Sequence, residues 1–241
     1  MAGHTVVKAI ETVHADRQRL LERVAGNLRR ADLPGAERDH PPAFAEYSFD
    51  AAATPAQLVD LFARELEPLA GHVHQVTEAA APAVVLDLVL RYGARRVLAW
   101  QPASAAQAAV ASELQRHGIE VLGLDLGRDA AARRAELSAI EDIAVGLTGA
   151  HAALADTGSL VLTSGPGRMR LASLLPPVHI ALVRQADLYP ALPAFLAANP
   201  DIVAAGSNVV IVTGPSRTAD IEMTLSHGVH GPKHLHVVVT T

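Results

Sequence analysis

This sequence contains no cysteine and few aromatic residues. The 241 residues include no Cys, and only 3% are aromatic. The absence of cysteine excludes disulfides, thiol nucleophiles and iron–sulfur clusters held by the chain's own thiolates, and it is consistent with the reducing cytoplasm. The shortage of aromatic side chains removes the platforms on which single-stranded bases stack.

Excess positive charge and long apolar runs are also missing. The net charge is -5, so the chain lacks the basic surface typical of nucleic-acid-binding proteins. No segment reaches about 18 consecutive apolar residues, and the N-terminus lacks the pattern of a signal peptide. We find no P-loop, no GxGxxG after a strand and no GxSxG elbow, and we expect no bound cofactor. The remaining composition, 50% hydrophobic and 19% charged, is that of a globular protein with a sizeable core.

The N-terminal part differs from the rest of the chain. Apolar residues recur with a period near 3.6 over residues 5–31, which predicts an amphipathic helix. A segment rich in Pro, Ala and charge follows and is interpreted as a connector. We therefore divide the chain into a helical arm with its connector, residues 1–50, and an α/β domain, residues 51–241. Two arrangements stay open: the helix packs on the sheet, or it extends as an arm that can exchange between protomers of a homo-oligomer.

Helices and strands alternate beyond residue 54. The predicted helices cover 56–70, 77–92, 103–117, 129–138 and 188–198. The predicted strands cover 72–76, 95–100, 120–125, 142–149, 159–164, 178–184, 208–214 and 234–241. Apolar strands alternating with helices indicate an open, mostly parallel α/β sheet flanked by helices. The shorter connections in the last third predict some antiparallel pairing there.

One local pattern occurs twice after apolar strands. The segments "LVLTSGPGR" and "VIVTGPSR" each pass from a strand through Thr to a Gly-Pro turn and an arginine, Arg168 and Arg217. Ligands of an open α/β sheet lie beyond the carboxyl ends of its strands, where backbone N–H groups favour anions and the Arg fork matches a carboxylate or phosphate. We therefore expect both turns to border one pocket for a small carboxylate or phosphate.

The candidate ligand-binding residues come from both turns and from the segment behind the second turn. They are Gly165, Gly167, Arg168, Gly214, Pro215, Ser216, Arg217, Thr218, Asp220, Glu222 and His230. The alternative is that each Gly-Pro pair is only a turn, and that Arg217 pairs with Asp220 or Glu222 at the surface.

A third group of candidates precedes the strand at 159–164. Asp156, Thr157, Gly158 and Ser159 place a carboxylate and two hydroxyls beside a glycine turn, and we expect Thr157, Gly158 and Ser159 to bind ligand in the same pocket as the two Gly-Pro turns. Asp156 is the candidate catalytic residue, because a carboxylate whose pKa is raised by burial can act as a base or nucleophile. The alternative is an Asx-type turn in which the side chain caps its own backbone.

The histidines form a recurring His-x-His pattern. It occurs at 72–74 and again at 234–236, and the two histidines of such a pair share one face of a strand. Asp220 and Glu222 could add oxygen ligands for a metal. The spacing matches no compact zinc signature, so we expect no metal site from the sequence.

Three longer blocks resemble a known family. They are "DIAVGLTGAHAALADTGSLVL", "GRMRLASLLPPVHIALV" and "TGPSRTADIEMTLSHGVHGPKHLHVVV", which follow one another between Asp142 and Val239. In order and spacing they resemble the lactate utilisation protein C family, the LUD-domain proteins. The N-terminal part is similar only in general shape.

The resemblance implies more than the residues do. It implies an open α/β sheet like that of the NagB/RpiA/CoA-transferase group, with ligands held at strand ends. It also implies action with iron–sulfur partner proteins that oxidise L-lactate to pyruvate, and the lack of cysteine is consistent with redox centres in those partners. The family often has Glu where this chain has Asp156. A side chain shorter by one methylene disfavours nucleophilic catalysis of the kind seen in related CoA-transferases.

Two classes of function therefore stay open. The first is a non-redox subunit of a lactate-oxidising complex in the cytoplasm, without nucleic-acid or membrane partners. The second is a free-standing enzyme that acts on a small phosphorylated or CoA-linked substrate.

Overall fold

A computed structural model describes most of the chain beyond residue 51. The described residues are 18–23, 26, 49, 52–123, 129–204, 206–219, 225–227 and 231–241, with the backbone alone at 217–219 and 225–227. The chain divides into two compact units, Met1–Ser48 and Phe49–Thr241. In the first unit residues 18–23 are helical, within the helix that the apolar period predicts.

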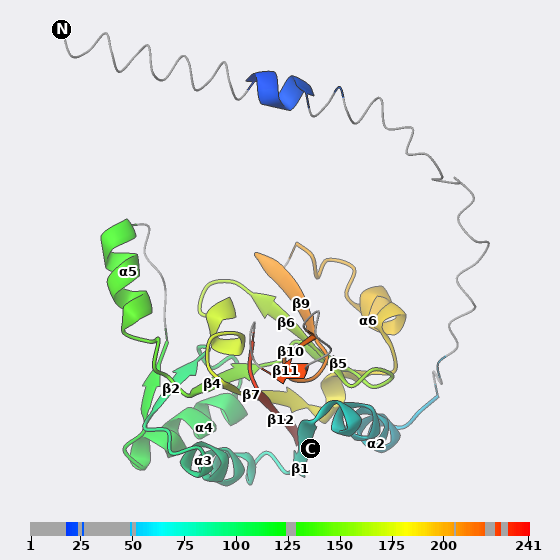
Figure 1. Cartoon of the computed structure of the whole chain (residues 1–241). Helices are drawn as coiled ribbons and strands as arrows, with labels where there is room; N and C mark the ends of the chain where they lie inside the picture. Colours follow the sequence, from blue (N-terminus) through cyan, green and yellow to red (C-terminus); the bar gives the residue numbers. More distant parts are fainter. Residues whose placement is uncertain are drawn as a thin grey trace, which may run out of the picture. The chain divides into compact units, whose positions relative to one another are not determined.

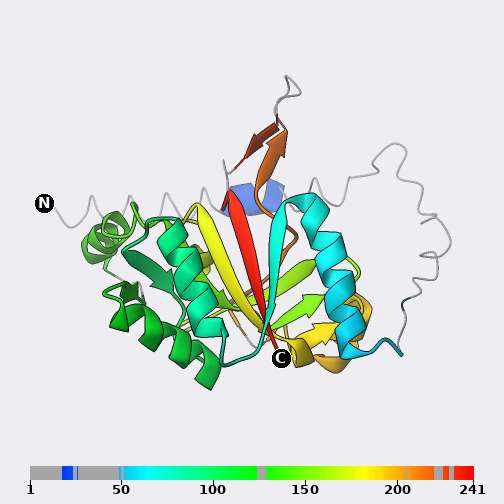
Figure 2. The same cartoon turned by 90° about the horizontal axis from the view of Figure 1, so that it is seen from below.

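A six-stranded sheet forms the centre of the second unit (Figures 1 and 2). Its strands, in spatial order, are β1 (Gly71–Val76), β12 (His234–Thr240), β7 (Val178–Arg184), β4 (Val145–Gly149), β2 (Arg96–Ala99) and β3 (Glu120–Leu122). Every pair of neighbours is parallel. Parallel strands covered on both faces carry nearly continuous apolar runs, as "VHIALVR" of β7 does.

Helices α3 (Ala81–Arg91) and α4 (Ala105–Arg116) cover one face of this sheet (Figure 2). Their buried side chains, among them Val85, Leu88 and Leu114, share one core with Val145 and Ile180 of the sheet. Each helix begins where the chain turns back from a strand. This places the amino end of α4 just beyond the carboxyl end of β2.

The other face packs against a smaller sheet and helix α2 (Pro55–Leu66). The small sheet has the order β8 (Leu188–Tyr189), β5 (Ala152–Leu154), β6 (Ser159–Ser164) and β9 (Asn208–Val212). In it β6 pairs antiparallel with both β5 and β9. Phe62 and Leu66 of α2 fill the space between Leu160 of β6 and Val237 of β12.

The remaining elements are short or lie at the edges. They are helices α5 (Ala130–Ser138) and α6 (Leu192–Ala198), the 3₁₀ turns η1 (Glu67–Leu69), η2 (Arg170–Ser173) and η3 (Gln185–Asp187), and the antiparallel pair β10 (Arg217–Ala219) and β11 (Leu225–His227). None of the helices in the described part of the chain is long and apolar enough to cross a membrane.

The structure confirms the predicted fold class and corrects several elements. The open, mostly parallel sheet and the antiparallel pairing in the last third are both present. Strands β5, β8, β10 and β11 were not predicted from the sequence. The helix predicted at 188–198 begins only at Leu192, because Leu188 and Tyr189 first pair with β5.

The backbone of η2 crosses closely over Gly146 of β4, and this contact can be tested by substitution. An added Cβ at Gly146 would overlap the carbonyl oxygen of Ala172, whereas at Gly123 the nearest heavy atom would be 3.9 Å away. We expect Gly146→Ala to lower the free energy of unfolding by about 1–3 kcal/mol, as overpacking does, and the control Gly123→Ala to change it by less than about 0.5 kcal/mol. Urea unfolding measures both, and equal midpoints for the two variants would contradict the crossing.

The N-terminal arm gives a second prediction. The connector after residue 31 is rich in Pro, and the first buried apolar residue among those that the structure describes is Leu58. We expect a chain lacking residues 1–40 to retain a cooperative thermal transition, with a changed oligomeric state if the arm exchanges between protomers. Loss of cooperative melting would place the arm in the core of the domain.

Candidate functional site

A pocket of about 430 Å³ lies at the carboxyl ends of the central parallel strands. It is lined by Gln101 after β2, by Gly149 to His151 at the end of β4, by Arg184 at the end of β7 and by Thr240 at the end of β12. Strand ends of a parallel sheet present their last backbone groups in one direction, which makes this edge the usual place for a ligand.

The first Gly-Pro turn brings Arg168 to this pocket. In Gly165–Pro166–Gly167–Arg168, backbone hydrogen bonds join Gly165 and Arg168 in both directions, at 3.2 and 2.9 Å. Gly167 has φ 68°, which a Gly after Pro adopts readily in a tight turn. The turn is held to the pocket because Gln101 N–H donates to the Gly167 carbonyl at 2.8 Å. Arg168 thus lines this strand-end pocket, and its role in ligand binding stays a prediction.

The guanidinium of Arg168 is positioned by a neutral group. Its Nη1 donates to the hydroxyl of Thr163 at 3.2 Å, and Thr163 itself is buried on β6. The ion pairs found in the described part of the chain include none for Arg168. A half-buried guanidinium without a carboxylate beside it retains its attraction for an anion.

The amino end of α4 adds further donors to the same pocket. The Ser104 hydroxyl accepts from Gln107 N–H at 3.3 Å and the Gln107 side chain accepts from Ala103 N–H at 2.7 Å, which together fix the start of the helix. The remaining N–H groups of a first helical turn have no partner within the helix and favour negative charge. Gly149 allows this close approach, because an added Cβ there would overlap the Gln107 amide.

Another part of the pocket lining is polar and was not predicted from the sequence. Arg184 donates two hydrogen bonds to Asp187, at 2.7 and 2.8 Å, so its charge is largely compensated. Asn199 Nδ2 donates to the Tyr189 hydroxyl at 3.3 Å. His151 lines the pocket directly after β4. These residues belong to no motif, and only the position of His151 just behind a predicted strand could have indicated it.

Most of the other predicted site residues gather elsewhere. The hydroxyls of Thr157 and Ser159 are 2.8 Å apart, and Ser159 lies 2.6 Å from the hydroxyl of Thr213. Gly158 packs against Leu66 at the end of α2, and Gly214 lies 3.1 Å, measured from an added Cβ, from Leu69. The hydrogen bond between Ser159 and Thr213 therefore joins the first and the third of the sequence blocks that resemble the family. This hydroxyl cluster is not part of the pocket lining.

The pairing of β6 with β9 explains this separation. The two strands run antiparallel, with Leu160 opposite Val212 and Ser164 opposite Asn208. The turn after β6 and the turn after β9 consequently lie at opposite ends of the pair. A strand of this length spans roughly 16 Å at about 3.3 Å per residue. Among the residues whose side chains are described, Arg168 of the first turn lines the pocket and Gly214, Pro215 and Ser216 of the second do not. For the side chain of Arg217, the expectation that both turns border one pocket stays a prediction.

Asp156 belongs to the hydroxyl cluster. The Thr157 hydroxyl donates to its carboxylate at 3.3 Å, and its backbone N–H donates to the Pro190 carbonyl at 3.1 Å. Partial burial raises the pKa of Asp156, although the Thr157 hydroxyl and nearby backbone N–H groups oppose this shift. Its catalytic role stays a prediction, and the pocket does not include it.

The second Gly-Pro turn is described only in part. Ser216 N–H donates to the Pro232 carbonyl at 2.8 Å, which ties this turn to the start of β12. Pro215 is buried beside it. The structure describes the backbone of Arg217 and Thr218, and Asp220, Glu222 and His230 lie outside the described residues. The proposed pairing of Arg217 with a carboxylate therefore stays a prediction.

Metal-ligating side chains form no group of three or more His, Asp or Glu that could hold a metal ion within the described ranges. The pocket offers Arg168, a helix amino end, the mutually compensated Arg184–Asp187 pair and neutral polar groups, which is a set suited to a small anion.

Comparison with known proteins places the chain in a family. The model of the LUD domain matches residues 59–240, which include all six strands of the central sheet and every residue of the pocket. The chain belongs to the LUD-domain family. The resemblance stated from the sequence is confirmed.

The chain is similar to proteins called lactate utilization protein C and to one solved structure. "Lactate utilization protein C" of Halalkalibacterium halodurans is 33% identical over 180 residues, which are 73% of this chain and 76% of that protein. The protein of the same name from Geobacillus sp. (strain WCH70) is 27% identical over 236 residues, covering 95% and 97%. A crystal structure of a DUF162 family protein from Deinococcus radiodurans covers 78% of this chain and 99% of that one, with a TM-score of 0.59 and 22% identity, which shows the shared fold.

Proposed function

We propose that this LUD-domain protein is a component of a lactate utilisation system and holds a small organic anion in the pocket at the carboxyl ends of β2, β4 and β7. The names of its relatives support a role in lactate utilisation, since two relatives that match most of the chain are called lactate utilization protein C. The chain has no cysteine thiolates that could hold an iron–sulfur cluster. Oxidation of L-lactate to pyruvate is accordingly assigned to iron–sulfur partner proteins.

A single observation carries the assignment of the pocket. The Arg168 guanidinium lines it with a hydroxyl as its hydrogen-bond partner, beside the first turn of α4. Both groups attract negative charge, and Arg offers two parallel donors to a carboxylate. Thr163 fixes one side of the guanidinium, so that less conformational freedom is lost when an anion binds.

The volume of the pocket favours the second candidate function, a free-standing enzyme that acts on a phosphorylated or CoA-linked substrate. A volume of about 430 Å³ exceeds what a three-carbon acid fills. A phosphorylated or CoA-linked substrate would use more of it, as expected for a free-standing enzyme. Asp156 lies outside the pocket, so in that reading it is not assigned as the nucleophile.

Activity of the isolated chain separates the two candidates. We expect the purified protein to contain no stoichiometric iron and to give no lactate-dependent dye reduction, because it has no cysteine to hold a cluster. Addition of the iron–sulfur partner proteins should be required for turnover. Sustained dye reduction by the chain alone would contradict the proposal, and turnover of a phosphate or CoA ester would favour the alternative.

A further inference from the structure

Two His-x-His segments that are far apart in the sequence lie side by side in the structure. Strands β1 and β12 are parallel neighbours, with His72 opposite His236. Residues two apart on a strand share a face, so His72 and His74 lie on the same side of the sheet as His234 and His236. This face is the one that α3 covers. The histidines begin their strands, whereas the pocket lies at the other ends.

The rings pack closely under the end of α3. The ring of His236 stacks on His72 at a centroid distance of 4.9 Å and on His74 at 5.3 Å. Tyr92, just behind α3, closes the group, with its ring 5.4 Å from that of His234. Only 4% of His236 is exposed, whereas His74 is half-buried and can be reached from solvent.

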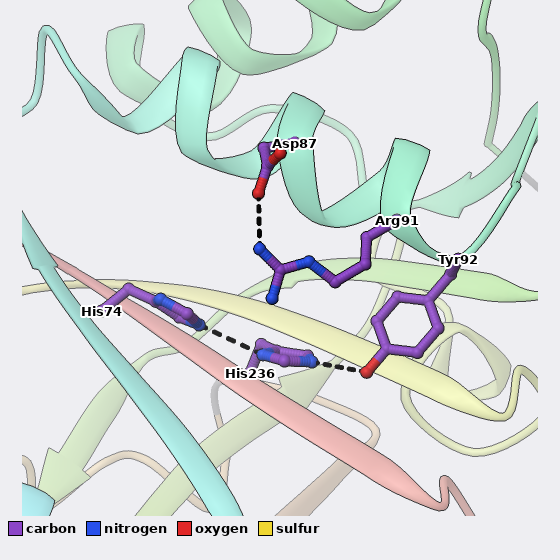
Figure 3. Close-up of polar contacts among 5 residues, drawn as sticks. All are labelled: His74, Asp87, Arg91, Tyr92 and His236. Atoms are coloured by element: carbon purple, nitrogen blue, oxygen red, sulfur yellow. Dashed lines mark hydrogen bonds and ion pairs between the residues drawn. The ribbon is translucent and has the colours of Figure 1, made fainter.

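Two ring nitrogens converge in this cluster (Figure 3). His74 Nε2 and His236 Nδ1 are 3.1 Å apart, and the far nitrogen of His236, Nε2, lies 2.8 Å from the Tyr92 hydroxyl oxygen. Two nitrogens bound to one metal ion at about 2.0–2.1 Å stand roughly 2.8–3.4 Å apart for bond angles between octahedral and tetrahedral. The contact is a hydrogen bond between the two rings, and the same separation suits two ligands of one metal ion that takes the place of the shared proton.

Tyr92 supplies the outer partner that such a site needs. A ligating imidazole usually donates its other N–H to an oxygen, which fixes the tautomer and the ring orientation. With the Nε2 proton of His236 directed to the Tyr92 oxygen, the Nδ1 lone pair faces His74. His74 presents its own Nε2 lone pair in the tautomer that is protonated at Nδ1, so no proton has to leave the protein when a cation enters.

One positive group faces the site and is compensated. The Arg91 guanidinium lies over the rings in Figure 3, and its Nη2 is 2.8 Å from the Asp87 carboxylate on the previous turn of α3. This pair is exposed and bears no net charge together. Repulsion of an incoming cation is thereby reduced.

We propose that His74 Nε2 and His236 Nδ1 chelate a divalent ion of the zinc, nickel and copper class, with water completing the coordination shell and Tyr92 as the positioning residue. Imidazole nitrogens favour these ions over magnesium or calcium, which prefer oxygen ligands. The site is separate from the anion pocket. Its role is to clip the edge strand β1 to β12, since one ligand comes from each strand.

Calorimetric titration of the full chain with ZnCl₂ tests the site. We expect a saturable 1:1 event that MgCl₂ does not reproduce. His74→Ala and His236→Asn should each weaken zinc binding by more than about tenfold, and Tyr92→Phe by about tenfold or more, as loss of an outer partner does. The control His117→Ala removes an exposed histidine directly after α4 and should leave the affinity unchanged.

The outcomes are distinguishable even if one variant folds poorly. His236 is buried, so His236→Asn is the variant most prone to misfold. His74 is half-buried and Tyr92→Phe keeps the ring, and these two then decide the result. Anomalous scattering from a zinc-soaked crystal should place the ion between His74 and His236. The proposal is overturned if the wild type takes up no zinc, or if zinc affinity survives both His74→Ala and Tyr92→Phe.

Discussion

Replacement of Arg168 by alanine will weaken binding of a small anion by about tenfold to a hundredfold, because hydrogen bonds to charged groups contribute roughly 1.5–3 kcal/mol. The pocket keeps the amino end of α4 in this variant, so weak binding should persist. The melting temperature without ligand should change little, since the guanidinium is bonded only to Thr163 among the described contacts. Pyruvate, L-lactate and inorganic phosphate are the probes, and the ligand-induced rise in melting temperature is the readout.

Two companion variants make this prediction specific. Arg168→Lys keeps the charge and loses the planar fork, so a site that uses both donors should weaken nearly as much as with alanine. Arg170→Ala removes a nearby exposed arginine that does not line the pocket, and it should bind as the wild type does. If Arg168→Ala and Arg170→Ala bind all three probes alike, the Gly-Pro-Gly-Arg turn has only a structural role.

Acid will destabilise the domain through His179. This residue of β7 is 1% exposed, its Nε2 lies 2.8 Å from the Thr148 hydroxyl, and its Nδ1 has no partner within the described residues. Burial lowers the pKa of His179 from 6.5 to about 4. The folded protein therefore favours the neutral ring. The resulting stability is fully present above pH 6.5, the unfolded value, and is lost as the pH falls toward 4.

The expected loss is large for one side chain. A depression of this size corresponds to about 3 kcal/mol across that pH window. Urea unfolding measured from pH 7 to pH 4 should show the decline, with a shallower slope in His179→Asn. His117→Asn, which changes an exposed histidine, should keep the wild-type slope. His236, whose pKa burial lowers to about 3, acts in the same direction, so some slope will remain. Identical slopes for His179→Asn and the wild type would contradict the role of burial.

The central sheet could be predicted because its strands have apolar sequences that are typical of strands buried on both faces. The run "VVVT" of β12 and the run "IALV" of β7 are apolar on both faces, as parallel strands between two layers must be. Strands β5 and β8 could not be predicted, because Ala152–Leu154 and Leu188–Tyr189 are too short to show a period. Their pairing depends on where β6 and the central sheet place them.

The candidate site was predictable only where one short segment carries the chemistry. The Gly-Pro-Gly-Arg turn indicated Arg168 because the turn residues and the guanidinium are contiguous. Tyr189 and Asn199 reach the same pocket from separate segments, and their hydrogen bond exists only after folding. The two similar turns were expected together because sequence does not give strand direction. Antiparallel pairing of β6 and β9 moves the second turn to the other end.

The position of a bound anion tests the central claim most directly. A crystal soaked in pyruvate or inorganic phosphate should show the anion in the pocket at the ends of β2, β4 and β7. It should lie within hydrogen-bond distance of the Arg168 guanidinium and of the first-turn N–H groups of α4. An anion bound instead at the Gly214–Thr218 turn, with the Arg168 pocket holding only water, would contradict the account.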